Sequence, residues 1–124
     1  MSNIEGKTVM IVDDTSFMRK MLKVVLEGAG CTVVAEAGDG ADALEKYQEH
    51  KPDFVTMDIV MPQMDGIASV KALRSIDPDA TIIMVSSAGQ DSKVMEAKEA
   101  GASNFILKPF EEKNVVNIIS SVFS

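Results

Sequence analysis

Polar side chains follow four apolar runs of the sequence, each at the point where the run ends. The acidic pair Asp13-Asp14 follows the first run, Asp58 the third, Ser86 the fourth and Lys108 the fifth. Any one case has an ordinary explanation, because loops are polar and acids are common near helix N-termini. The four together supply three acids, one hydroxyl and one ammonium at comparable positions, which indicates a shared site.

Such a set of side chains suits a metal-assisted reaction of a phosphoryl group. Three neighbouring carboxylates repel one another unless one of them is protonated or a cation joins them. Oxygen ligands favour a hard cation, and Mg²⁺ in particular needs few protein ligands because water and phosphate complete its octahedron. Lys108 would balance the remaining charge or contact a phosphoryl oxygen, and Ser86 could donate a hydrogen bond to the same group.

The pattern predicts phosphoryl transfer to a carboxylate, in which the acceptor oxygen attacks in line while cations stabilise the transferring charge. Asp58 is the best candidate acceptor because it stands alone with a loop beyond it, and Asp13 and Asp14 are better placed as metal ligands. The residue two positions after Asp58 is the apolar Val60, and the only histidine, His50, precedes a strand at the far end of a helix. An acyl-phosphate at Asp58 would therefore be long-lived, which fits a signal better than a hydrolase.

The elements that must position these residues alternate along the whole chain. Strands are expected at residues 7–12, 32–35, 54–57, 81–85 and 104–107, and helices at about 16–27, 41–50, 66–75, 91–100 and 111–123. The strand runs are continuously apolar, as in strands covered on both faces. Right-handed crossovers then give an α/β fold, a doubly wound five-stranded parallel sheet with five helices in three layers. In such a sheet all the carboxyl ends of the strands lie at one edge, which would bring the polar residues together.

Helical spacing also predicts which side chains face the core. Thr15 or Ser16 is expected to cap the first helix. The apolar residues of the helices expected at 16–27, 66–75 and 91–100 should pack inward. The last of these has the thinnest apolar face, so we expect it to be the most weakly held. The residues are, in the order of the helices, Phe17, Met18, Met21, Leu22, Val25 and Leu26; Ile67, Val70, Leu73 and Ile76; and Val94, Met95 and Ala97.

Composition excludes several classes of function. The 124 residues suit one domain, residues 1–124, and 46% are hydrophobic. A net charge of −7 argues against a nucleic-acid or anionic membrane surface as partner. No apolar run approaches the length of a membrane span, and the first residues do not form a signal peptide. The lone Cys31 begins an apolar run and is expected to be a buried thiol. We therefore expect a soluble cytoplasmic protein.

The chain resembles receiver domains of bacterial two-component response regulators over essentially its full length. The acidic pair Asp13-Asp14, Asp58 followed by Met-Pro and Asp-Gly, the hydroxyl of Ser86 and the Lys108-Pro109 pair stand in order at family spacing. In the absence of an output domain, it is most similar to the stand-alone members that act in chemotaxis. The resemblance implies a flavodoxin-like fold and a cis peptide bond before Pro109.

The same resemblance implies the roles of residues and partners. A phosphohistidine on a CheA-like histidine kinase would be the donor and Asp58 the acceptor, with Mg²⁺ held by Asp13, Asp14, Asp58 and the backbone carbonyl of Val60. Ser86 would swing toward the phosphoryl group while Phe105 turns inward, and Phe replaces the family's Tyr there. The fourth helix, fifth strand and fifth helix would form the output surface for a flagellar motor switch protein or another target. A phosphatase is a possible partner, the protein is expected to be a monomer, and it would not be an enzyme beyond self-phosphorylation and slow autodephosphorylation.

Other functions fit parts of the sequence. Gly38-Asp39-Gly40-Ala41-Asp42-Ala43 matches a permissive dinucleotide-binding fingerprint, but that function leaves Asp13-Asp14, Ser86 and Lys108 unexplained. An aspartyl-phosphate phosphatase usually carries a second acid two residues after its nucleophile, where this chain has Thr15 or Val60. A single-domain phosphorelay intermediate or a phosphate sink would have the same site as a motor regulator.

Overall fold

Apolar strands and amphipathic helices alternate five times in the computed structural model, which describes residues 4–59, 61, 66–87 and 91–123. The elements follow the order expected from the sequence and differ from the expected bounds by two residues or fewer. They are β1 (Thr8–Val12), α1 (Ser16–Gly28), β2 (Thr32–Ala37), α2 (Gly40–His50), β3 (Phe54–Asp58), α3 (Gly66–Ile76), β4 (Ile82–Ser87), α4 (Asp91–Ala100), β5 (Asn104–Lys108) and α5 (Glu112–Val122).

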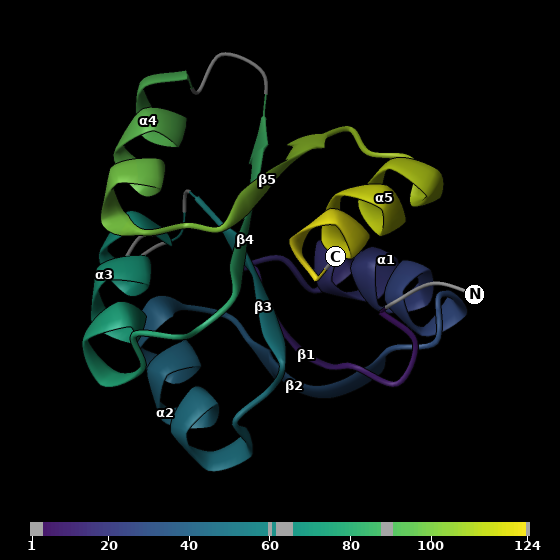
Figure 1. Ribbon diagram of the computed structural model, residues 1–124, viewed down its shortest axis with the longest axis horizontal. Coiled ribbons are helices and arrows are strands. Elements are labelled where there is room, and N and C mark those ends of the chain that lie inside the picture. The colour runs from purple at the N-terminus through teal and green to yellow at the C-terminus, as the bar shows by residue number, and fades with distance from the viewer. Residues whose placement is uncertain (1–3, 60, 62–65, 88–90, 124) are drawn as a thin grey trace.

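The strands form one parallel sheet in the order β2-β1-β3-β4-β5. Helices α1 and α5 cover one face of this sheet, and α2, α3 and α4 cover the other (Figure 1). The chain leaves β1 toward one edge of the sheet and returns through β3 toward the other edge, which confirms the doubly wound arrangement. The order reverses between β1 and β3, and α/β proteins bind ligands at the carboxyl ends of the strands beside such a reversal.

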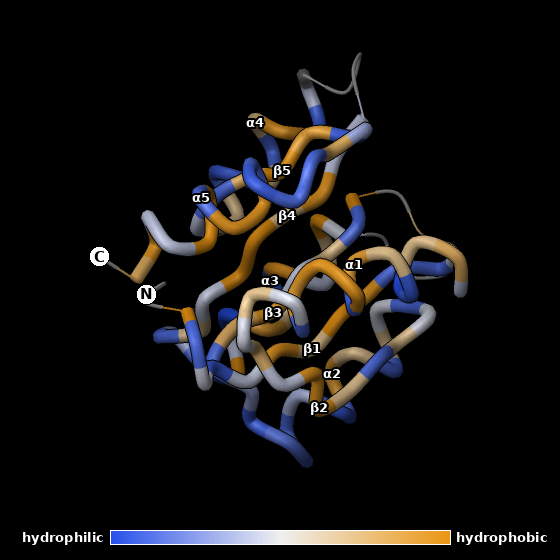
Figure 2. The backbone as a smooth tube through the Cα atoms, turned by 90° about the vertical axis from the view of Figure 1, so that its right-hand side faces the viewer, coloured by the Kyte–Doolittle hydropathy of each residue, from blue (hydrophilic) through white to orange (hydrophobic). Residues whose placement is uncertain are grey.

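The core has two halves because successive side chains of a strand point to opposite faces of the sheet. In β1, Val9 and Ile11 pack toward α1 and α5, whereas Met10 and Val12 pack toward α2 and α3. All four are buried. Figure 2 shows hydrophobic strands in the interior and hydrophilic stretches on the helices and loops around them. The buried thiol of Cys31 also confirms the expectation from the sequence, and burial raises its pKa.

Several side chains that were expected to face the core are exposed. On α1, Leu22 and Leu26 are buried, but Phe17 is 69% exposed and Met21 is 40% exposed. Each residue turns the helix by about 100°, so Met21 and Phe17 lie well to one side of the line through Leu22 and Leu26. The apolar arc of α1 is therefore wider than its contact with the sheet. The same prediction was wrong for Ile76, at the last position of α3, and for Met95 on α4.

Two local features of the backbone bear on the site. Thr15 occupies the N-cap position of α1, but its hydroxyl donates to Asp13 Oδ1 at 3.0 Å and makes no capping bond to the helix, contrary to the expected cap. At the start of α3, Gly66 donates its N–H to the Ile59 carbonyl at 2.8 Å, and a Cβ atom at Gly66 would lie 2.2 Å from the Asp58 carbonyl oxygen. Only glycine fits so close to the end of β3.

No helix in the described part of the chain is long and apolar enough to span a bilayer.

Candidate functional site

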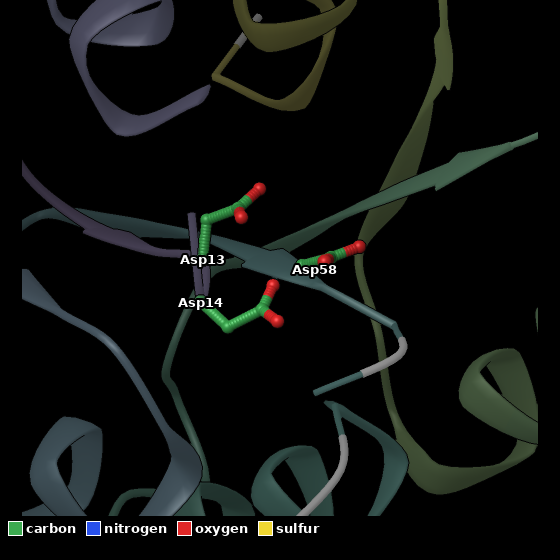
Figure 3. Close-up of side chains that lie close together, drawn as sticks. All are labelled: Asp13, Asp14 and Asp58. Atoms are coloured by element: carbon green, nitrogen blue, oxygen red, sulfur yellow. The ribbon is translucent and has the colours of Figure 1, made fainter. Parts of the chain in front are cut away.

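Three acidic side chains meet at the carboxyl ends of the two central strands. Asp58 is the last residue of β3, and Asp13 and Asp14 directly follow the neighbouring strand β1. One carboxylate oxygen from each of the three lies within 4.8 Å of the others (Figure 3). The convergence expected from the sequence is therefore confirmed, and its cause is that the two strands are parallel and adjacent.

Lys108 joins this cluster from the edge strand β5. Its Nζ lies 3.4 Å from Asp58 Oδ1 and 3.6 Å from Asp13 Oδ2. Strand β4 separates β3 from β5, so the long lysine side chain bridges that distance. The peptide bond from Lys108 to Pro109 is cis, as expected.

Burial makes the charges of this cluster costly. Asp13 is 1% exposed and Asp58 is 8% exposed, whereas Asp14 is exposed. Desolvation raises the pKa of the Asp58 carboxyl; Lys108 opposes this increase, and the negative charges of Asp13 and Asp14 reinforce it. The raised pKa of Asp58 thus reflects chiefly its burial, which the Lys108 ammonium offsets only in part.

One buried oxygen of Asp13 lacks a hydrogen-bond donor. Asp13 Oδ1 accepts from the backbone N–H of Thr15 at 2.9 Å and from its hydroxyl at 3.0 Å. Asp13 Oδ2 has no hydrogen-bond partner among the described residues and faces only the Lys108 ammonium at 3.6 Å. A buried carboxylate oxygen that lacks a hydrogen-bond donor can still bind a cation.

These residues fit a divalent metal ion. With all groups ionised, the three carboxylates and the Lys108 ammonium leave two net negative charges, which one divalent cation would neutralise. The donors are all carboxylate oxygens, which favour Mg²⁺ or Ca²⁺ over softer metals. Three carboxylates from the protein also leave room for water and phosphate oxygens, as Mg²⁺ requires.

Three other residues were predicted for this site: Ser86, Phe105 and Val60. Ser86 lies on β4 beside Val85, the partner of Asp58 in the sheet, and is buried. Phe105 lies on β5, half-buried against the core half formed with α2, α3 and α4. The predicted switching of these two residues stays a prediction. Val60, predicted to offer its carbonyl to the metal, lies outside the described residues.

Reasoning from the sequence missed one residue at this site. Arg19 of α1 donates from Nη1 to the backbone carbonyl of Asp13 at 2.6 Å. The only sequence signal was a cation in the first turn of the helix that follows the acidic pair, and such cations are common on exposed helix faces.

The topology argues against the dinucleotide-binding alternative. Residues 38–43 follow β2, which is an edge strand, and β1 separates β2 from the strand that carries Asp58. The acid that follows a true fingerprint lies on the strand adjacent to it. Here Asp39 serves a local purpose, since its side chain accepts the N–H of Asp42 and caps α2.

Comparison with known proteins gives a consistent result. The family model of the response regulator receiver domain matches residues 9–120. The chain is 52% identical to the chemotaxis protein CheY of Thermotoga maritima, over 94% of this chain and 98% of that protein. It is also 52% identical to CheY of Bacillus subtilis, over 94% and 97% of the two chains. Among solved structures, the CheX–CheY–BeF₃–Mg²⁺ complex of Borrelia burgdorferi superposes with a TM-score of 0.91 at 36% identity, covering 97% of this chain and 91% of that one.

Proposed function

Because this chain belongs to the response regulator receiver domain family, we propose that it is a phospho-accepting signalling switch that acts in chemotaxis. The observation that carries this proposal is the cluster of Asp13, Asp14, Asp58 and Lys108 at the carboxyl edge of the sheet. The cluster combines a candidate acceptor, a candidate metal site and a cation for the transferring group.

In the proposed reaction, an oxygen of Asp58 attacks the phosphorus of a phosphohistidine on a CheA-like sensor kinase. The new P–O bond forms as the P–N bond breaks, and the imidazole leaves with the bonding electron pair. The ammonium of Lys108, 3.4 Å from Asp58 Oδ1, would contact an oxygen of the phosphoryl group. The hydroxyl of Ser86 would donate to the same group after a change of rotamer.

We propose Mg²⁺ as the cofactor, held by Asp13, Asp14, Asp58 and the carbonyl of Val60. The open coordination of Asp13 Oδ2 and the negative charge of the cluster support this assignment. When bound, Mg²⁺ would neutralise charge on the transferring phosphoryl oxygens. The solved complex of CheX and CheY with BeF₃ and Mg²⁺ from Borrelia burgdorferi further supports it.

The proposed output surface comprises α4, β5 and α5. Met95 on α4 and Leu107 on β5 are exposed at 58% and 59%, so apolar side chains are available to a target there. Among the described residues of α4 only Ala97 is buried, so few core contacts oppose a shift of this helix. Phe105, on β5 between these elements, would turn inward as Ser86 moves toward the phosphoryl group.

We propose a flagellar motor switch protein as the target and a CheX-like phosphatase as a further partner, the latter because CheY of Borrelia burgdorferi is found in a complex with CheX. The protein would act as a cytoplasmic monomer with no catalytic activity on other substrates. A deletion of the gene, scored for the frequency of swimming reversals, tests the assignment to the motor. Unchanged reversals would favour a phosphorelay intermediate or a phosphate sink instead.

The acceptor is tested by incubating the protein with acetyl phosphate and Mg²⁺ and measuring its intact mass. We expect the wild type to gain one phosphoryl group and the Asp58→Asn variant to gain none. Asp79→Asn is the matched control, because Asp79 is an exposed aspartate on the α3–β4 turn that lies outside the cluster. Equal phosphorylation of the wild type and Asp58→Asn would refute the proposal.

A further inference from the structure

Every polar group of Asp13 except one carboxylate oxygen has a hydrogen-bond partner. Its N–H donates to the Ala37 carbonyl of β2 at 3.0 Å, and Oδ1 accepts two bonds from Thr15. Its carbonyl oxygen accepts from Arg19 Nη1 at 2.6 Å. Oδ2, the exception, is the atom that faces Lys108. The hydrogen bonds thus hold Asp13 in the orientation that leaves one oxygen available.

The carbonyl of Asp13 lies where the regular backbone ladders end. Strand β1 ends at Val12 and α1 begins at Ser16, and the first helical bond of this region joins the Arg19 N–H to the Thr15 carbonyl. Buried carbonyls need a donor, and here a side chain supplies it. That carbonyl belongs to the peptide unit between Asp13 and Asp14. Its orientation therefore determines how the two carboxylates are placed relative to each other.

Arg19 is itself held by a second contact. Its Nε lies 3.3 Å from Glu36 Oε1 on β2, and the arginine side chain is only 21% exposed. The backbone carbonyl of Glu36 accepts from Lys46 on α2 at 2.5 Å. The guanidinium thus joins the β1–α1 turn to the neighbouring strand, and its planar fork of donors suits two acceptors at once.

We propose that Arg19 is a positioning residue for the metal site, which sets the Asp13–Asp14 peptide plane and thereby the affinity for Mg²⁺. This inference rests on the proposed function only in requiring that the wild type binds Mg²⁺. Replacement of partners that orient metal ligands typically lowers metal affinity by about 10- to 100-fold. We expect the lower end for Arg19→Met, about tenfold, because Thr15 and Ala37 still hold Asp13.

Charge and positioning predict opposite results for this variant. Arg19 is a cation next to a site for a cation, so loss of its charge alone would strengthen Mg²⁺ binding. Loss of its hydrogen bond to the Asp13 carbonyl would weaken binding. Weaker binding by Arg19→Met therefore identifies the positioning role and separates it from the general electrostatic effect.

The experiment measures the Mg²⁺ dissociation constant of the full chain by isothermal titration calorimetry. Arg19→Met is expected to bind about tenfold more weakly, and Arg19→Lys, which keeps the charge and a hydrogen-bonding group, should recover part of the loss. Glu36→Gln should bind Mg²⁺ about threefold more weakly. The double variant, with both Arg19→Met and Glu36→Gln, should match Arg19→Met alone, because Glu36 affects the site only through Arg19. Partial recovery in Arg19→Lys keeps the test informative even if Arg19→Met folds poorly.

Arg74→Met is the matched control. Arg74 on α3 also donates to backbone carbonyls, from Nε to Gly101 at 2.9 Å and from Nη1 to Pro78 at 3.0 Å, but it lies outside the acidic cluster. We expect its loss to lower thermal stability and leave the Mg²⁺ affinity unchanged. Unchanged or tighter binding by Arg19→Met, with normal wild-type binding, would overturn the role of Arg19 alone. A wild type that does not bind Mg²⁺ would overturn the proposed function together with this inference.

Discussion

Replacement of Asp58, the proposed acceptor, by asparagine should stabilise the protein in the absence of metal. Asp58 is 8% exposed, and its carboxylate lies beside those of Asp13 and Asp14. Asparagine has nearly the same shape but no charge. The Asp58→Asn variant therefore removes repulsion and desolvation from the folded state, at the cost of the attraction to Lys108.

The distances give the size of this effect. Two unit charges 4.8 Å apart, the upper limit in this cluster, repel by about 3.5 kcal/mol at an effective dielectric constant of about 20. Asp58 takes part in two such repulsions, and its attraction to Lys108 at 3.4 Å is worth about 5 kcal/mol on the same scale. Asp14 is exposed, so its repulsion is screened, and the attraction to Lys108 offsets the repulsions. Desolvation, the largest cause of the raised pKa, then disfavours the ionised carboxylate by about 2 kcal/mol. We expect the free energy of unfolding of Asp58→Asn to exceed that of the wild type by about this amount.

The difference should depend on pH with a definite sign. The pKa of Asp58 is raised in the folded protein, chiefly by desolvation, above the ordinary value of about 3.9 that it has in the unfolded chain. Between these two values the folded state binds more protons, so wild-type stability falls as the pH rises through that window. The advantage of Asp58→Asn should therefore be complete above the raised pKa and vanish below about pH 3.9.

Urea unfolding followed by circular dichroism measures this difference, with EDTA present and at several pH values. The control Asp79→Asn should change stability by less than about 0.5 kcal/mol, as exposed substitutions usually do. Added Mg²⁺ should stabilise the wild type more than Asp58→Asn, because a ligand bound only by the folded state adds to its stability. A metal-free Asp58→Asn protein that is no more stable than the wild type would contradict the view that ionised Asp58 destabilises the folded protein.

Three further substitutions test other parts of the structure. Lys108→Met should bind Mg²⁺ several-fold more tightly, by calorimetry, because the competing ammonium is gone, yet take up phosphate roughly a hundredfold more slowly in the intact-mass assay; a normal rate would exclude a role for Lys108 in the transfer. Phe54→Ala should lower the free energy of unfolding by about 3–5 kcal/mol in urea, because the ring is fully buried at the base of β3; a loss below about 1 kcal/mol would contradict that burial. Tyr47→Phe removes the 2.6 Å hydrogen bond from the phenol to Asp77 and should cost about 1 kcal/mol. This bond is the main cause of the lowered pKa of Asp77, so NMR titration of the variant should find that pKa moved up toward its ordinary value, and an unmoved pKa would assign the decrease to other groups.

The elements and the acidic cluster could be predicted because each depends on a strong local signal. Continuous apolar runs identify buried parallel strands, and parallel strands bring Asp13, Asp58 and Lys108 to one edge whatever the details of packing. The exposure of Phe17 and Met21 could not be predicted, because periodicity shows which residues share a helix face but not how wide the contact with the sheet is. The bond from Arg19 to the Asp13 carbonyl was also hidden. It depends on a backbone group without a ladder partner, and backbone groups leave no trace in the pattern of side chains.

The close approach of Gly66 to the end of β3 has a consequence for how such a protein can evolve. A Cβ atom at this position would meet the Asp58 carbonyl at 2.2 Å and the Ile59 Cα atom at 2.8 Å. Both obstacles are backbone atoms, so no substitution of a neighbouring side chain can make room. By contrast, nothing lies within 4 Å of the corresponding point at Gly6. Sequence change can thus alter the exposed helix faces without this penalty, whereas any side chain at Gly66 would force the backbone at the end of β3 to move.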